Sequence, residues 1–188
     1  MRMGIYLGSF NPVHKAHIKI VNHLLDNNYL DKILIIPTGN YWDKNDLVNI
    51  KHRIEMLKFF ESSKIEIDTT NNLYPYSYLV LESLEKKYSD DFLYLILGAD
   101  NIINFDKWKN YEELLKYNFI IINRDEVDIL SYLEKLGKKD GFIIVDDLDK
   151  MDISATKIRD DIRSGVLSSD LDSRVYNYIK ENELYKNN

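Results

Sequence analysis

The stretch MGIYLGSFNPVHKAH, residues 3–17, combines an apolar run, a glycine, a turn and two histidines. The run 3–8 has the length of a β-strand, residues 9–12 have the composition of a turn, and a helix is expected to begin between Lys15 and Ile18. His14 and His17 are three residues apart, so their side chains can face the same way if the helix starts at His14. The unpaired N–H groups and the dipole of a helix N-terminus favour an anion. The stretch therefore predicts a strand, a turn and a helix that form a phosphate site.

Similar apolar runs recur along the chain and alternate with helical patterns. The runs occupy residues 32–37, 64–68, 92–98, 118–123 and 141–145. The helical patterns occupy residues 16–28, 50–63, 76–88, 111–117 and 129–137, and two more helices are expected from Ser154 and from about Asp170. Most of the runs are continuous, which is typical of strands covered on both faces. The pattern predicts a doubly wound α/β fold, a Rossmann-like parallel sheet with helices on both faces, that binds its ligand at the carboxyl ends of the strands.

Composition limits the classes of function. A chain of 188 residues without repeats or linkers is expected to form a single domain over residues 1–188. Its net charge of -6 argues against a nucleic acid partner. The absence of cysteine excludes disulfides and thiolate metal sites, so any metal is expected to be Mg²⁺ carried by the substrate. No apolar stretch approaches the roughly 18 residues of a membrane span, so we expect a cytoplasmic protein without a membrane partner.

A second motif is DISATKIRDDI, residues 152–162, which has the pattern of a helix capped by Ser154. Thr156, Lys157 and Arg159 crowd its first turn and a half, where basic side chains oppose the helix dipole. A bound anion would reconcile them. The alternative is an ordinary capped helix at the surface.

Both motifs resemble those of a known superfamily. GSFNPVHKAH resembles the G-[ST]-F-[DN]-P-x-H-x-G-H signature of nucleotidyltransferases that transfer AMP or CMP to phosphorylated acceptors, although Ala16 replaces the usual glycine. ISATKIR is similar to the ISxTxxR motif of the same superfamily, which holds the triphosphate of ATP. Over nearly its whole length the chain resembles the nicotinate-nucleotide adenylyltransferase family. That resemblance implies transfer of AMP from ATP to nicotinate mononucleotide, with Mg²⁺ on the phosphates and no metal ligands in the chain itself.

The resemblance also implies roles for individual residues on the ATP side. His14, His17 and Arg159 are expected to be catalytic, with His17 at the α-phosphate. LGADN, residues 97–101, looks like the family's GAD segment, in which Asp100 would meet ribose hydroxyls or cap a helix. The residues expected to bind ATP are Gly8, Ser9, Phe10, His14, His17, Gly98, Asp100, Ser154, Thr156 and Arg159.

The residues expected to bind the acceptor are Lys44, Ser77, Tyr78, Trp108 and Arg124. Trp108 lies in FDKWKNYEELL and would stack on the nicotinate ring, unless it belongs to the core. Asp43 and Leu79 replace a histidine and a threonine of the family pattern, next to Lys44 and Tyr78.

His52 and Arg53, at the start of the helical pattern 50–63, also resemble the family and are expected to lie on a solvated face.

Several alternatives remain open. The acceptor could be nicotinamide mononucleotide, and acid and amide could both be used. Phosphopantetheine is less favoured, because the enzymes that use it lack the GAD and tryptophan segments. A nucleotide sensor without turnover is another reading, and a metal hydrolase would need a carboxylate near the histidine pair. A homo-oligomer is left open.

Overall fold

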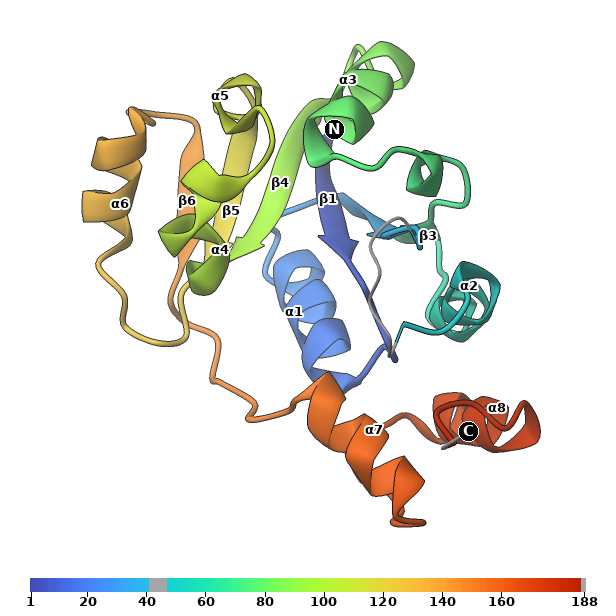
Figure 1. Ribbon diagram of the computed structural model, residues 1–188. Coiled ribbons are helices and arrows are strands. Elements are labelled where there is room, and N and C mark those ends of the chain that lie inside the picture. The colour runs from blue at the N-terminus through green and yellow to red at the C-terminus, as the bar shows by residue number, and fades with distance from the viewer. Residues whose placement is uncertain (41–46, 187–188) are drawn as a thin grey trace.

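The computed structural model describes residues 1–40 and 47–186 and contains a six-stranded sheet in the order β3-β2-β1-β4-β5-β6 (Figure 1). Every neighbouring pair of strands is parallel. The strands are β1 (Arg2–Gly8), β2 (Lys32–Pro37), β3 (Ile65–Ile67), β4 (Phe92–Gly98), β5 (Asn118–Ile122) and β6 (Phe142–Val145). The predicted strands and the parallel α/β architecture are confirmed.

The α-helices of the described residues are α1 (Lys15–Asp26), α2 (Ile50–Lys58), α3 (Ser77–Lys87), α4 (Ala99–Ile103), α5 (Tyr111–Leu114), α6 (Ile129–Leu136), α7 (Ala155–Arg163) and α8 (Ser173–Glu181). Ser154 caps α7, as predicted. Helix α2 is shorter than predicted, because the chain turns after Lys58 and Phe59 and Phe60 pack against Arg174. Within the described part of the chain, no helix is long and apolar enough to cross a membrane.

Alternate side chains of every strand except β3 enter two hydrophobic clusters, one on each face of the sheet, and β3 contributes only to the first. Ile33 and Ile35 of β2 belong to the cluster that α1, α2 and α8 cover. Leu34 and Ile36 belong to the cluster that α3 to α6 cover. The chain runs outward from β1 to β3 and then returns to the other side of β1 as β4. The strand order therefore reverses between β1 and β4, where a crevice is expected at the strand ends.

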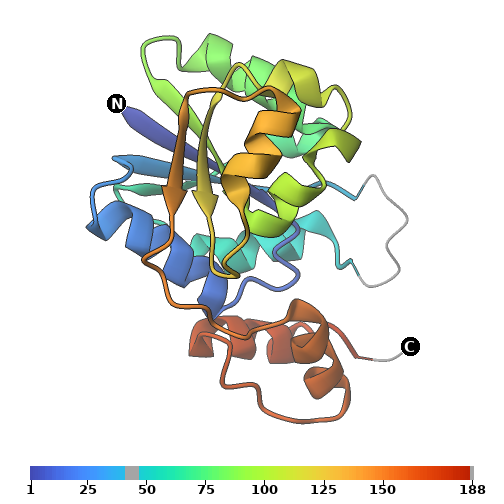
Figure 2. The same cartoon turned by 90° about the vertical axis from the view of Figure 1, so that its left-hand side faces the viewer.

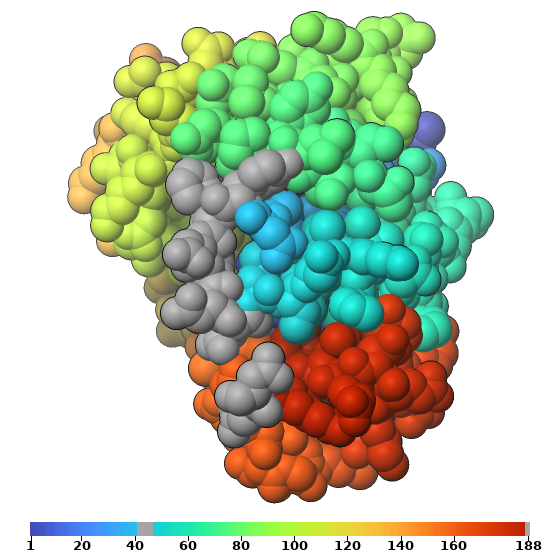
Figure 3. Space-filling view, turned by 45° about the vertical axis from the view of Figure 1, so that its right-hand side comes forward, coloured from blue at the N-terminus to red at the C-terminus, as the bar shows by residue number. Residues whose placement is uncertain are grey.

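Helices α7 and α8 lie beyond the carboxyl ends of the strands (Figure 2). Ile158, Val175 and Ile179 belong to the same hydrophobic cluster as residues of α1. A hydrogen bond of 2.9 Å joins His52 Nδ1 of α2 to the Tyr178 hydroxyl of α8. On the surface, the C-terminal residues lie against the segment that contains α2 (Figure 3, red against cyan). The C-terminal helices are thus packed beside the end of the sheet where a ligand is expected.

Candidate active site

The turn after β1 is built on the packing of Phe10. This residue has a positive φ of 46°, and its ring lies against Gly8, where an added Cβ would come within 3.0 Å of the ring. The ring is 2% exposed and meets His17 edge to face, with centroids 4.9 Å apart. Phe10 was predicted to bind ATP, but its side chain supports His17 from within the core, which leaves its backbone for any contact with a ligand.

His14 and His17 lie side by side at the start of α1. His14 is the N-cap, and its backbone N–H donates a hydrogen bond of 3.1 Å to His17 Nδ1. The two rings are stacked with centroids 3.7 Å apart, which confirms that they share one face. A neutral imidazole has one donor and one acceptor nitrogen. Because Nδ1 of His17 accepts, the proton of the neutral ring is on Nε2.

Both histidines are neutral at neutral pH. Burial, together with the nearby Arg124, lowers the pKa of His14 to about 4. The pKa of His17 is well below its ordinary value, mainly because the ring is buried and secondarily because His14 and Arg124 lie near it. The pair therefore offers hydrogen bonds, and Arg124 provides positive charge beside it.

A cavity of about 250 Å³ lies between the histidines and the ends of β4 and β5. Gly98, Asp100 and Arg124 line it together with His14 and His17. The structure thus brings together four of the residues predicted for ATP. Arg124 was predicted for the acceptor, but it lies on this side because β5 ends next to β4.

Helix α7 is joined to the turn after β1 through Arg159. Its Nη1 donates to the Asn11 carbonyl at 2.8 Å, and its Nη2 donates to Thr156 Oγ1 at 3.2 Å. Arg159 Nε is buried and has no hydrogen-bond partner among the described residues. Ser154 and Thr156 are exposed at the start of the helix, and Ile153, directly before them, lines the cavity.

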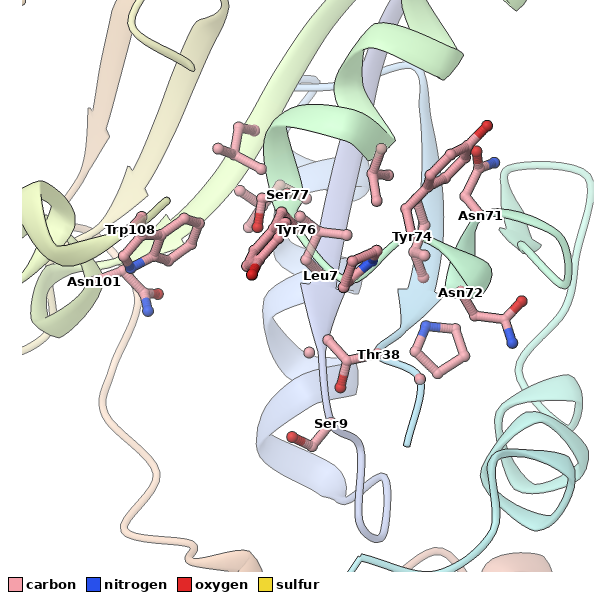
Figure 4. A pocket seen from close by; sticks show the side chains of 18 of the residues that line it. Leu7, Ser9, Thr38, Asn71, Asn72, Tyr74, Tyr76, Ser77, Asn101 and Trp108 are labelled. Atoms are coloured by element: carbon pink, nitrogen blue, oxygen red, sulfur yellow. The ribbon is translucent and has the colours of Figure 1, made fainter. Parts of the chain in front are cut away.

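A second cavity of about 360 Å³ lies on the α3 side of the same strand ends. Ser77 and Trp108, which were predicted for the acceptor, line it (Figure 4). Gly8 and Ser9, which were predicted for ATP, line this cavity as well and not the histidine cavity. Trp108 also packs on Phe105, with ring centroids 5.0 Å apart, so the predicted roles in the pocket and in the core are compatible.

Tyr78 is not among the residues that line this pocket. It packs against the hydrophobic cluster under α3, and Tyr76 lines the pocket in its place. Figure 4 shows Tyr76 and Trp108 pointing toward one another from different elements. The sequence reasoning missed Tyr76, because alignment with the family motif selected the tyrosine after Ser77. A pattern of strand, turn and helix does not say which of two tyrosines near a helix start faces the sheet edge.

Arg53 is a correction to the sequence analysis. It was expected on a solvated face, but it is fully buried at 0% exposure. It precedes Met56 and Leu57 by three and four residues, and both of these are buried. That spacing put it on the apolar face of α2, a signal that was present in the sequence. His52 beside it is half-buried against Tyr178.

Lys44, and Asp43 beside it, lie outside the described residues.

The described residues include no group of three or more His, Cys, Asp or Glu side chains that could hold a metal ion. Asp100 is the one carboxylate among the described residues that line the histidine cavity. Mg²⁺ prefers six oxygen ligands and usually keeps several waters when it binds through phosphates. This donor set suits an ion that arrives on a nucleotide.

Comparison with known proteins agrees with this architecture. The Cytidylyltransferase-like family model matches residues 5–161. A relative from Acholeplasma laidlawii, named "Probable nicotinate-nucleotide adenylyltransferase", is 36% identical over 97% of this chain and 96% of its own length. A relative of the same name from Clostridium tetani is 33% identical over 98% of this chain and 99% of its own.

Among solved structures, the nicotinic acid mononucleotide adenylyltransferase of Plasmodium falciparum in complex with NaAD has the same fold, with a TM-score of 0.82 and 24% identity over 98% of this chain and 97% of that one. The parallel sheet, the crevice at its strand ends and the histidine pair, together with the family model, define a nucleotidyltransferase of the cytidylyltransferase-like class. Within that class, the chain belongs to the nicotinate-nucleotide adenylyltransferase family.

Proposed function

We propose that this protein transfers AMP from ATP to nicotinate mononucleotide and releases deamido-NAD and pyrophosphate, a step of NAD biosynthesis. The observation that carries the proposal is the pair of cavities at the switch between β1 and β4. They share Ile96, Leu97 and Asn101 as a common wall. One offers hydrogen bonds and positive charge, and the other offers aromatic faces, which suits a triphosphate on one side and a pyridine ring on the other.

The reaction needs alignment and charge stabilisation. A phosphate oxygen of the mononucleotide attacks the α-phosphorus of ATP; a new P–O bond forms as the bond to the oxygen bridging to the β-phosphorus breaks, and pyrophosphate leaves with that electron pair. A phosphate monoester is already an anion at neutral pH, so the protein supplies no nucleophile. His17 Nε2–H donates to the α-phosphate, and His14 to the phosphate chain. Arg124 and Arg159 neutralise the remaining charge, and the hydroxyls of Ser154 and Thr156 donate hydrogen bonds to the phosphates.

On the acceptor side, Trp108 and Tyr76 hold the pyridine ring, and Ser77 lies beside them. The first N–H groups of a helix have no partner within the helix, and those of α3 begin at Ser77, in the wall of the pocket. A carboxylate suits such a position better than a neutral amide. This arrangement supports the acid as acceptor, and Lys44 stays a prediction for its phosphate.

Mg²⁺ bound to the triphosphate would supply further neutralisation of charge when present. Asp100, the one carboxylate among the described residues that line the histidine cavity, would meet the waters of such an ion or the ribose hydroxyls. The cytoplasmic location and a homo-oligomeric assembly stay predictions.

Pyrophosphate release from ATP and Mg²⁺ tests the proposal, with nicotinate mononucleotide, nicotinamide mononucleotide and phosphopantetheine supplied separately. We expect strong preference for the acid. Equal use of the amide would indicate dual specificity. If ATP binds but no pyrophosphate is released with any of the three acceptors, the result would favour a nucleotide sensor without turnover.

A further inference from the structure

Arg53 makes three hydrogen bonds from three different nitrogens. Its Nε donates to the Val48 carbonyl at 3.0 Å, its Nη1 to the Ser9 carbonyl at 2.8 Å, and its Nη2 to Asn40 Oδ1 at 3.1 Å. The guanidinium is planar, so these directions are fixed relative to one another. The Arg53 side chain therefore holds two backbone carbonyls and one side-chain amide in fixed positions relative to one another.

The three acceptors belong to two stretches of the chain that are far apart in sequence. Ser9 lies in the turn after β1, where it lines the acceptor pocket, and the same turn continues to the histidine pair. Asn40 and Val48 both follow β2 in the chain, and Thr38 and Gly39, next to Asn40, line the pocket with Trp108. Arg53 is thus a bridge between the turn that carries Ser9 and continues to the histidine pair, and the chain after β2 at the opposite part of the pocket wall.

Neighbouring contacts tighten the same bridge. Asn40 Oδ1 also accepts the backbone N–H of Ile50 at 3.0 Å, so the start of α2 is tied to this segment. The backbone N–H of Val48 donates to Asn11 Oδ1 at 3.3 Å. Arg53 and Asn11 therefore both connect the turn after β1 with Val48, and Arg53 also connects this turn with Asn40.

All three acceptors of Arg53 are neutral oxygens. Burying a charge costs free energy unless hydrogen bonds compensate it, and an apolar side chain would fill a core position without that cost. The desolvation is visible in the pKa of Arg53, which burial lowers to about 10. An arginine at such a position is better explained by the chain segments that its hydrogen bonds hold in place than by a gain in stability.

We propose that Arg53 is a positioning residue for AMP transfer, which fixes the turn that leads to the histidine pair against the wall of the acceptor pocket. The proposal rests on the proposed function. In-line attack requires the two phosphates to be aligned, and a misplacement of about 1 Å can cost roughly 10²-fold in rate. Because Arg53 touches the two walls and lies away from both cavities, its loss changes alignment more than binding.

Substitution of Arg53 by methionine and by lysine tests this role. We expect Arg53→Met to lower kcat by roughly 10- to 100-fold. The equilibrium Kd of ATP and of nicotinate mononucleotide should change by less than about threefold, since no residue proposed to touch either ligand is removed. Arg53→Lys retains the charge and one donor group and should be intermediate. Guanidinium ion added to Arg53→Met should restore part of kcat.

Arg174 of α8 provides a control at an exposed position. It pairs with Asp172 at 3.0 Å, packs on Phe59 and Phe60, and donates to the Phe59 carbonyl at 2.8 Å. Arg174→Met should keep kcat near that of the wild type, whatever its effect on Tm. Equal losses of kcat in both variants, or an unchanged kcat in Arg53→Met with a lower Tm, would overturn the proposal.

Amide hydrogen exchange supplies a readout that does not depend on the acceptor. Arg53→Met should exchange faster than the wild type at residues 9–12 and at residues 47–49, and Arg174→Met should not. Unchanged exchange at both segments would refute the positioning role even in an active enzyme. Faster exchange at both segments in a protein that uses none of the tested acceptors would support the bridge and contradict the proposed function.

Discussion

At the scale of the residue, the position of one proton decides what His17 can do. Its Nδ1 accepts the His14 backbone N–H at 3.1 Å, so Nε2 carries the proton and the ring donates. Its low pKa means that the neutral form is present at neutral pH. The proposed role of His17 is therefore that of a hydrogen-bond donor to a developing charge, which needs no proton transfer.

Removal of that donor gives the first prediction. His17→Ala should lower kcat by about 10² to 10³, the usual cost of losing one preorganised donor. Pyrophosphate release under saturating substrates measures it. His23→Ala is the control on the same helix, since His23 pairs with Asp147 at 2.9 Å and lies outside both cavities. A His17→Ala enzyme within about threefold of the wild type would remove the proposed role.

The buried state of His14 predicts how stability depends on pH. An unfolded histidine takes up a proton below about pH 6.5, whereas His14 in the folded protein does so only near pH 4. Between these values the unfolded state binds more protons, so the free energy of unfolding falls as the pH falls. The stability gained from keeping His14 neutral is therefore fully present above about pH 6.5, and the part of the free energy of unfolding that is lost at low pH is on the order of 3 kcal/mol.

Urea unfolding between pH 4.5 and 7 measures this effect. His14→Gln has no titrating ring and should show a shallower decline of the free energy of unfolding than the wild type. Identical slopes for the two proteins would mean that His14 titrates normally in the folded state.

Motif residues could be predicted from the sequence, because they combine unusual types at fixed spacing. His14 and His17 after a short strand, and Ser154 at a helix start, are examples. Tyr76 and Arg53 were missed for different reasons. The orientation of Tyr76 depends on how α3 docks on the sheet, which is a tertiary property. Arg53 lay on an apolar face, but its charge argued for solvent, and the three oxygens that accept its hydrogen bonds in the interior could not be identified from the sequence.

At the scale of the element, continuous apolar runs predicted the strands well, since burial on both faces is a strong signal. Helix α4 (Ala99–Ile103) was expected only through the possible capping role of Asp100, because five residues are too few to show a helical period. Its presence matters for the site, since Gly98 is its N-cap and the Gly98 N–H donates to Asn101 Oδ1 at 2.9 Å. The sequence analysis had offered Asp100 for the capping role.

The segment after α8 makes a contact that the sequence did not reveal. Tyr185 is buried, and its hydroxyl donates to Asn11 Oδ1 at 2.7 Å. Tyr185→Phe should lower the free energy of unfolding by about 1 kcal/mol, the net value of a typical hydrogen bond. It should also raise the KM for ATP a few-fold, because the Asn11 carbonyl accepts Arg159.

Denaturant titration and initial rates over a range of ATP concentrations check both effects. Tyr176→Phe is the control, since it removes a hydroxyl from α8 itself. A Tyr185→Phe protein with wild-type stability and KM would show that the contact contributes nothing to either.

At the scale of the whole molecule, the two hydrophobic clusters share one sheet. Leu171, Val175 and Ile179 extend the first cluster into the C-terminal region. We therefore predict that all of the described residues unfold together. Calorimetry should show one transition whose calorimetric and van't Hoff enthalpies agree. A separate early transition that is lost on deletion of residues 154–188 would instead indicate an independent C-terminal unit.

The common wall of the two cavities has a consequence for the end of the catalytic cycle. A ligand that fills both cavities is a single molecule, so when one of its nucleotides is bound the other is present at a high effective concentration at its own cavity. The joined dinucleotide should therefore bind more tightly than either of the nucleotides from which it is made. Dissociation of the product would then limit turnover, and dinucleotide already present would inhibit its own synthesis.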